Sequence, residues 1–291
     1  MISLKPDRRT FLFTLGLAGL ATHLGAQPRT LPPVERTEID VGSRKVPLFL
    51  WRAPETKAVV VFSHGAGADP EAYGRLLRRW RDAGISVVAP LHVDSRLHPD
   101  HEKYTLASAF APRWRDMTDA VAFARAIFPG MKIGAAGHSY GSLFAEMMAG
   151  ALPGVFGPPK APLDAVVTFS SPGKIQPLVR ADSFKGLTVP LLALTGDRDV
   201  GFGAVTDWHD HLYAYETAPA GDKYAWVGRG VDHLYGGAID RAPSPTDQNR
   251  QFDEAAALST QFLRAYLEND TAARTALTTH ADTPLGHFTH R

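Results

Sequence analysis

A serine between two glycines lies near the middle of the chain, in the segment Gly-His-Ser-Tyr-Gly at positions 137–141. The segment follows an apolar run at Lys132–Ala136 and precedes a helical pattern at Ser142–Ala151. In so tight a turn from strand to helix, the serine hydroxyl is exposed and the residues around it must be small. The N-terminus of the following helix favours negative charge that develops near this hydroxyl. The pattern predicts a nucleophilic Ser139 on a nucleophile elbow. The alternative is a structural turn in which the serine caps the helix.

Two loops further along the chain carry groups that could activate such a serine. Asp199 follows an apolar run at Pro190–Leu194, and His233 follows one at Tyr224–Val227. An imidazole titrates near neutrality, so His233 would take the serine proton during attack and return it to the leaving group. Asp199 would fix the tautomer of that imidazole and stabilise its charged form. Together these residues are the expected catalytic triad.

Other residues compete for the same roles. The Gly-x-x-Asp spacing that begins at Gly196 favours Asp199, and Asp197 is expected to stabilise the turn instead. His138 is adjacent to the serine and is expected to pack or form hydrogen bonds rather than act as the base. The other histidines are weaker candidates for the base. His209 and His211 precede the last apolar run, and three lie in the polar C-terminal segment: His280, His287 and His290.

A loop of small residues upstream could stabilise negative charge in the reaction. The apolar run at Ala58–Phe62 ends in Ser-His-Gly-Ala-Gly-Ala-Asp at positions 63–69. Small side chains allow main-chain N–H groups to approach a reacting carbonyl oxygen. The expected oxyanion hole therefore consists of the backbone N–H groups of Ala66 and Tyr140. His64 is expected to brace the loop through hydrogen bonds.

Composition excludes several classes of site. The chain has 291 residues and no cysteine, which removes disulfides, thiolate nucleophiles and cysteine-bearing metal or redox centres. The 31 Lys and Arg residues are balanced by 30 Asp and Glu residues, so no basic field favours nucleic acid. One loop contains four potential metal ligands, His92, His98, Asp100 and His101, but their spacing matches no established metal site. We therefore expect neither a metal nor a cofactor.

Apolar runs alternate with amphipathic stretches, and this alternation predicts an α/β fold whose mostly parallel sheet carries helices on both faces. The expected strands are Val46–Trp51, Ala58–Phe62, Ile85–Ala89, Lys132–Ala136, Ala165–Phe169, Pro190–Leu194 and Tyr224–Val227. The expected helices are Glu71–Asp82, Trp114–Ile127, Ser142–Ala151 and Asn249–Leu267.

Connections and edges complete the expected domain. We expect one domain over residues 27–291, with an antiparallel edge hairpin within Glu38–Trp51 and a polar tail from about residue 270. The connection Ser170–Thr188 is too short for a separate lid domain. The irregular segment His92–Pro112 forms either a rim of the substrate cleft or a solvated loop.

The N-terminus has the features of an export signal. Arg8 and Arg9 precede Phe11-Leu12 and a short, mildly apolar stretch, which resembles a twin-arginine signal peptide. The stretch is shorter than a membrane span and is interrupted by glycines. We therefore expect removal of residues 1–26 and a periplasmic or secreted protein without membrane attachment. The alternatives are an uncleaved anchor or a buried first helix.

From about Lys57 to Leu267 the chain resembles the α/β-hydrolase superfamily, in which the nucleophile, acid and histidine occur in the order Ser139, Asp199, His233. The His-Gly-Ala-Gly loop at positions 64–67 and the elbow at positions 137–141 are similar to those of dienelactone-hydrolase-like and platelet-activating-factor-acetylhydrolase-like esterases. Dienelactone hydrolases use a cysteine nucleophile, so Ser139 argues against their namesake substrate.

The resemblance implies a serine hydrolase that cleaves small carboxylic esters through an acyl-enzyme at Ser139, and the N-terminal signal implies that it is exported. A peptidase or thioesterase with the same triad is an alternative, because the triad does not specify the leaving group. A binding protein that keeps the scaffold without turnover is the other alternative. The sequence gives no indication of oligomeric state.

Overall fold

The computed structural model describes residues 34–157, 162–200, 205–241 and 246–291. The expected export signal at residues 1–26 lies outside these ranges. The described strands are β1 (Glu35–Val41), β2 (Arg44–Trp51), β3 (Ala58–Ser63), β4 (Ile85–Pro90), β5 (Ile133–His138), β6 (Ala165–Phe169), β7 (Leu191–Gly196), β8 (Lys223–Gly228) and β9 (Gly286–His290).

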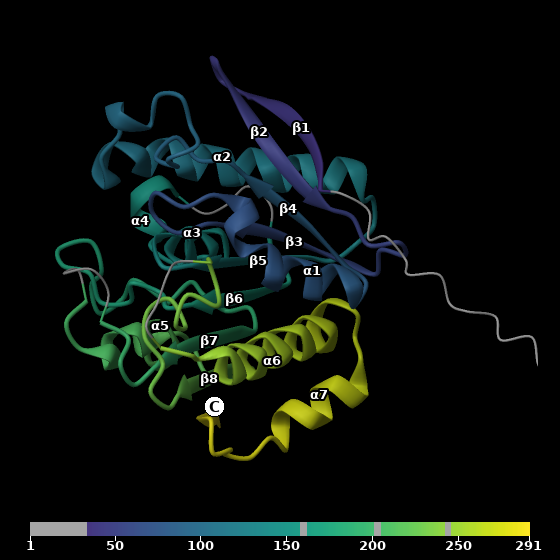
Figure 1. Cartoon of the computed structure of the whole chain (residues 1–291), viewed down its shortest axis with the longest axis vertical. Coiled ribbons are helices and arrows are strands. Elements are labelled where there is room, and N and C mark those ends of the chain that lie inside the picture. The colour runs from purple at the N-terminus through teal and green to yellow at the C-terminus, as the bar shows by residue number, and fades with distance from the viewer. Residues whose placement is uncertain (1–33, 158–161, 201–204, 242–245) are drawn as a thin grey trace, which may run out of the picture. The chain divides into compact units, whose positions relative to one another are not determined.

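Helices connect most of these strands (Figure 1). The described α-helices are α1 (Gly74–Asp82), α2 (Leu106–Ile127), α3 (Tyr140–Met148), α4 (Pro153–Phe156), α5 (Tyr213–Thr217), α6 (Asn249–Leu267) and α7 (Thr271–Thr278). Three 3₁₀ helices also occur within the described ranges: η1 (Pro70–Tyr73), η2 (His101–Lys103) and η3 (Trp208–Leu212).

The described strands form one nine-stranded sheet in the order β1-β2-β4-β3-β5-β6-β7-β8-β9. The six central strands, β4-β3-β5-β6-β7-β8, are parallel to one another. Strands β1 and β2 at one edge and β9 at the other edge pair in antiparallel fashion. This confirms the mostly parallel sheet and the antiparallel edge hairpin. The carboxyl ends of the parallel strands meet at one edge, where a ligand site is expected.

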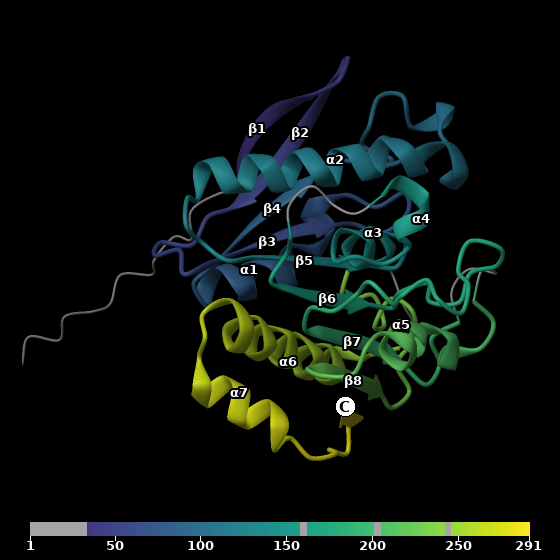
Figure 2. The ribbon, with the colours of Figure 1, turned by 180° about the vertical axis from the view of Figure 1, so that it is seen from behind.

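Both faces of the sheet are covered, which explains why its central strands are apolar throughout. In β3, Val60 and Phe62 pack on the side that α1 and α6 cover. Val59 and Val61 pack on the opposite side, beneath α2 and α3. Figure 2 shows the same layers from behind.

The connection between β6 and β7 is made of turns and irregular backbone, and no separate lid domain occurs among the described residues. Nor does any described helix combine the length and apolar character that crossing a membrane requires.

Helix α2 begins earlier than the sequence pattern predicts. Its first residue is Leu106 rather than Trp114, so the last part of the segment expected to be irregular, His92–Pro112, is helical. Thr105 and Ser108 form a capping box in which each side chain accepts the other residue's backbone N–H. Pro112 lies inside the helix and removes one hydrogen bond without ending it.

The C-terminal segment is also more ordered than the expected polar tail. Residues 270–291 contain α7, which Asp270 caps, and β9, which pairs with β8. Phe288 of β9 is buried and contacts the apolar core through Tyr224. The strand was missed because its sequence, Gly-His-Phe-Thr-His, contains a single large apolar residue.

Candidate active site

Ser139 lies in a strained turn between β5 and α3. Its backbone dihedrals are φ 51° and ψ −126°, a region that residues with side chains rarely adopt. A Cβ atom on Gly137 would overlap the backbone of Gly141, and one on Gly141 would overlap the carbonyl oxygen of Ser63. Glycine is therefore required at both positions. The tight turn places Ser139 at the carboxyl end of β5.

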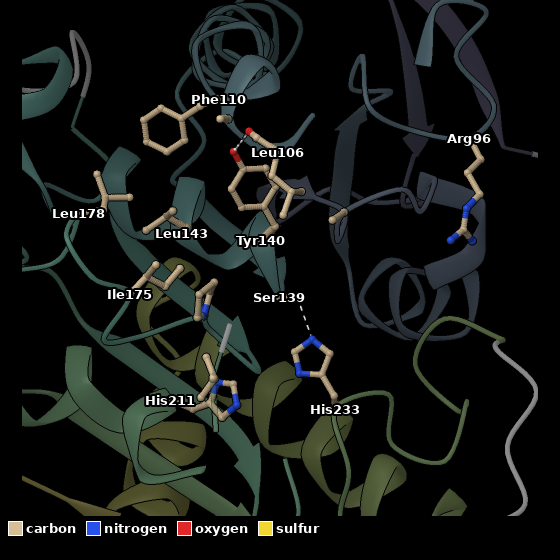
Figure 3. A pocket seen from close by; sticks show the side chains of 14 residues that line it. Arg96, Leu106, Phe110, Ser139, Tyr140, Leu143, Ile175, Leu178, His211 and His233 are labelled. Carbon is tan, nitrogen blue, oxygen red and sulfur yellow. Dashed lines mark hydrogen bonds between the residues drawn. The ribbon is translucent and has the colours of Figure 1, made fainter. Parts of the chain in front are cut away.

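The three residues that the sequence predicted as a triad lie together. Figure 3 shows the hydrogen bond between Ser139 and His233. The Nε2 atom of His233 is 2.8 Å from the Oγ atom of Ser139, and its Nδ1 atom is 2.6 Å from Oδ1 of Asp199. Thr195 donates a hydrogen bond to Oδ2 of Asp199 at 2.7 Å. Asp199 is completely buried, whereas the His233 side chain keeps a small exposed area.

His211, treated above as a weak rival, contacts the same carboxylate. Its Nε2 atom is 2.9 Å from Oδ1 of Asp199 and 3.0 Å from the Asp199 carbonyl oxygen. Its Nδ1 atom is hydrogen bonded to the carbonyl oxygen of Ser171. Because each ring nitrogen faces oxygens that only accept, both nitrogens must carry a proton for both hydrogen bonds to form.

The electrostatics of these groups agree with a charged His211. Burial is the largest single influence and disfavours the imidazolium, but the hydrogen bond and charge of Asp199 and the hydrogen bonds to the Ser171 and Asp199 carbonyl oxygens together raise the pKa of His211. Burial alone would raise the pKa of Asp199, yet hydrogen bonds from His211 and His233 hold that pKa well below its usual range. The carboxylate is therefore ionised, and it is shared between two histidines.

Asp199, His211 and His233 also have the spacing of a possible metal site, with their ligand atoms within 4.8 Å of one another. The carboxylate oxygen lies only 2.6 Å and 2.9 Å from the two ring nitrogens. Two ligands of one tetrahedral zinc ion are about 3.3 Å apart. The arrangement matches hydrogen-bonded partners better than ligands of a shared ion.

Asp197 and His138, which compete with the triad residues in the sequence, form hydrogen bonds to the loop that carries His233. Oδ1 of Asp197 accepts a hydrogen bond from the Gly230 N–H at 2.7 Å, which ties its turn to the loop that carries His233. His138 contacts Tyr73 through Nδ1 and the His233 carbonyl oxygen through Nε2, each at 2.9 Å. Burial lowers the pKa of His138 to about 3, so this ring is neutral.

His64 braces the small-residue loop, as its position suggested. Its Nδ1 atom is 2.7 Å from the Gly65 carbonyl oxygen, and its Nε2 atom accepts the His92 N–H at 3.1 Å. Burial holds the pKa of His64 well below its ordinary value, so the ring is a neutral brace. Other rival histidines pair with nearby carboxylates away from the triad, His209 with Asp207 and His287 with Asp282.

A cavity of about 660 Å³ opens above Ser139. Ala66 and Tyr140, the expected oxyanion-hole residues, line it together with Ser139, His211 and His233 (Figure 3). Most of its other walls are apolar: Leu106, Ala107, Phe110, Leu143, Pro172, Ile175, Leu178 and Val205. Arg96 and the first turns of α2 belong to the wall, so the segment at 92–112 contributes a rim of the cleft.

Solved structures with the same architecture carry hydrolase names. A dienelactone hydrolase from Anabaena variabilis matches with a TM-score of 0.58 and 17% identity, covering 81% of this chain and 99% of that chain. An esterase from Thermogutta terrifontis with bound propionate matches with a TM-score of 0.59 and 13% identity, over 81% and 95%. An esterase from an Arctic intertidal metagenomic library matches with a TM-score of 0.58 and 16% identity, over 80% and 94%.

The chain has the α/β-hydrolase fold. Neither a scan against protein-family models nor a search of curated proteins finds a match. In this α/β-hydrolase sheet, Ser139 follows β5, Asp199 follows β7 and His233 follows β8, which places all three at the carboxyl edge.

Proposed function

We propose that this chain is a serine hydrolase that cleaves carboxylic esters through an acyl-enzyme at Ser139. The observation that carries the proposal is the continuous hydrogen-bond chain from the Ser139 hydroxyl through His233 to the buried Asp199 carboxylate. The esterase and dienelactone hydrolase names of structural neighbours agree with it.

In the first half-reaction, Nε2 of His233 takes the proton of the Ser139 hydroxyl as the oxygen attacks the ester carbonyl. The carbonyl oxygen becomes an oxyanion and accepts hydrogen bonds from the Ala66 and Tyr140 N–H groups. The imidazolium then gives its proton to the leaving alcohol as the ester C–O bond breaks. A water molecule attacks the acyl-enzyme by the same route and releases the acid and the serine.

The apolar walls of the cavity favour an uncharged acyl group. Burial of methylene groups against Leu143 and Ile175 would add binding energy at about 0.8 kcal/mol for each buried CH₂ group. We therefore propose small-molecule esters with apolar acyl chains as the substrates. Export of the chain through its N-terminal segment, with action in the periplasm or outside the cell, remains part of the proposal.

A panel of nitrophenyl esters, acyl thioesters and aminoacyl amides tests the proposal with purified wild type and Ser139→Ala. Ester hydrolysis that is several orders of magnitude slower in the variant supports it. Faster turnover of the thioesters or amides would reassign the substrate class. No turnover of any substrate would favour a binding protein.

A further inference from the structure

Arg113 of α2 is a fully buried arginine beneath the expected oxyanion hole. A guanidinium does not lose its charge in proteins, so its N–H groups need acceptors when water is excluded. Asp94 supplies two of them, 2.7 Å from Nε and 2.8 Å from Nη2. Burial would raise the pKa of Asp94, but Arg113 outweighs burial and holds that pKa well below its usual range.

The other N–H groups of Arg113 reach the main chain of the small-residue loop. Nη1 donates to the His64 carbonyl oxygen at 2.8 Å, and Nη2 donates to the Gly65 carbonyl oxygen at 3.1 Å. Asp94 also binds this loop, because its Oδ2 atom accepts a hydrogen bond from the Gly67 N–H at 3.4 Å. One buried ion pair therefore holds three residues of the loop, His64, Gly65 and Gly67.

The Gly65 carbonyl belongs to the same peptide unit as the Ala66 N–H. In a trans peptide, which this one is, the C=O and N–H bonds point in opposite directions. Arg113, at 3.1 Å, and the buried Nδ1 of His64, at 2.7 Å, both hold the Gly65 oxygen toward the protein interior, so the Ala66 N–H is turned to the opposite side. Ala66 lines the cavity above Ser139, which is where a reacting carbonyl would lie.

The same guanidinium also contacts the residue that supplies the second expected donor. Its central carbon lies 4.8 Å from the centre of the Tyr140 ring, a cation–π distance. The Tyr140 hydroxyl donates to the Leu106 carbonyl oxygen at 2.7 Å, which fixes the other end of the ring to the start of α2. Arg113 thus contacts the carbonyl of the peptide that carries one expected donor and the side chain of the residue that carries the other.

We propose that Arg113 is the positioning residue of the oxyanion hole, setting the direction of the Ala66 N–H through the Gly65 carbonyl and supporting Tyr140 through its ring. The inference rests on the proposed function. Arg113 touches no substrate and acts only through the two donors. Its loss should therefore weaken binding of the transition state and leave binding of the ground state nearly unchanged.

The test compares Arg113→Lys and Arg113→Met with wild type in ester hydrolysis. Lysine keeps the charge, but its three donors lie on one nitrogen atom, so it cannot reproduce the two bonds to Asp94 together with the bonds to both carbonyl oxygens. We expect kcat to fall about 10-fold in Arg113→Lys and about 10²-fold to 10³-fold in Arg113→Met, with KM within about 3-fold. The inhibition constant of phenylboronic acid, which forms a tetrahedral adduct on the serine, should weaken in parallel with kcat/KM.

Arg44→Gln is the matched control. Arg44 forms an ion pair with the neighbouring buried Asp116 at 2.6 Å and makes no described contact with the loop at 64–67. This variant should lower the melting temperature and change kcat less than 2-fold. If Arg113→Met does not fold, Arg113→Lys and Asp94→Asn still supply the comparison, with folding checked by circular dichroism.

The outcomes separate the inference from the proposed function. A folded Arg113→Lys with wild-type kcat and wild-type boronate affinity overturns the inference alone, as does an equal loss of kcat in Arg44→Gln. A wild-type protein that neither hydrolyses esters nor binds the boronate overturns the proposed function, and the inference with it.

Discussion

Replacement of Glu146 by glutamine should remove a pH dependence from the stability of the protein. Glu146 lies on α3, the helix that follows Ser139, and its side chain is fully buried. Burial raises the pKa of this carboxyl to about 8 from an ordinary value of 4.5, outweighing the lowering effects of Ser171 and His211. At neutral pH the folded protein therefore keeps a proton that the unfolded chain releases.

The size of the effect follows from the two pKa values. Between pH 4.5 and pH 8 the folded state binds more protons than the unfolded state, so the free energy of unfolding falls as pH rises. Each pKa unit corresponds to about 1.4 kcal/mol, and the loss through this one group between pH 5 and pH 8 is about 3 to 4 kcal/mol. For a domain of this size that is a decrease of about 7 to 14 °C in melting temperature.

Thermal unfolding of wild type and Glu146→Gln at pH 5 and pH 8 measures this effect directly. Glutamine has nearly the same shape and does not titrate, so the variant should unfold near wild type at pH 5 and be about 3 kcal/mol more stable at pH 8. Burial also raises the pKa of Asp116, to about 6, but this group titrates in both proteins and cancels in the comparison. Equal losses of stability in the two proteins would show that Glu146 is not the group that titrates.

Two further substitutions test the active site. Asp199→Asn should lower kcat about 10⁴-fold, because a neutral amide neither fixes the tautomer of His233 nor stabilises its protonated form. It should also lower the melting temperature, because His211 loses its counter-charge. An unchanged kcat in steady-state kinetics would contradict the first expectation. Ile175→Trp should fill part of the cavity. It should lower kcat/KM for octanoyl esters at least 10-fold and leave kcat/KM for acetyl esters unchanged. An unchanged dependence of kcat/KM on acyl chain length would argue against an acyl site beside Ile175.

The sequence predicted those parts of the site whose chemistry depends on local spacing. Ser139 was found because a turn between β5 and α3 excludes side chains on both flanking glycines, and this steric demand leaves a readable pattern. Asp199 and His233 were found because each follows an apolar strand of the sheet. Each of these signals lies within a few residues of the group concerned.

The contacts of His211 and Arg113 could not be predicted in this way. His211 lies in a short polar 3₁₀ helix, and only the tertiary fold brings it beside Asp199. Arg113 is an arginine in an amphipathic helix, where a solvated charge is the usual expectation, and it is buried because Asp94 and two loop carbonyls lie opposite. Strand β9 was missed for a similar reason, since pairing with β8 rather than its own composition makes it a strand.

The central claim is that Ser139 is a nucleophile activated by His233. Incubation of the protein with a fluorophosphonate, followed by peptide mapping with mass spectrometry, tests it most directly. We expect one equivalent of phosphonyl group on the peptide that contains Ser139, and almost none after the substitution His233→Gln. Equal labelling of wild type and Ser139→Ala, or no labelling of the folded wild-type protein, would contradict it.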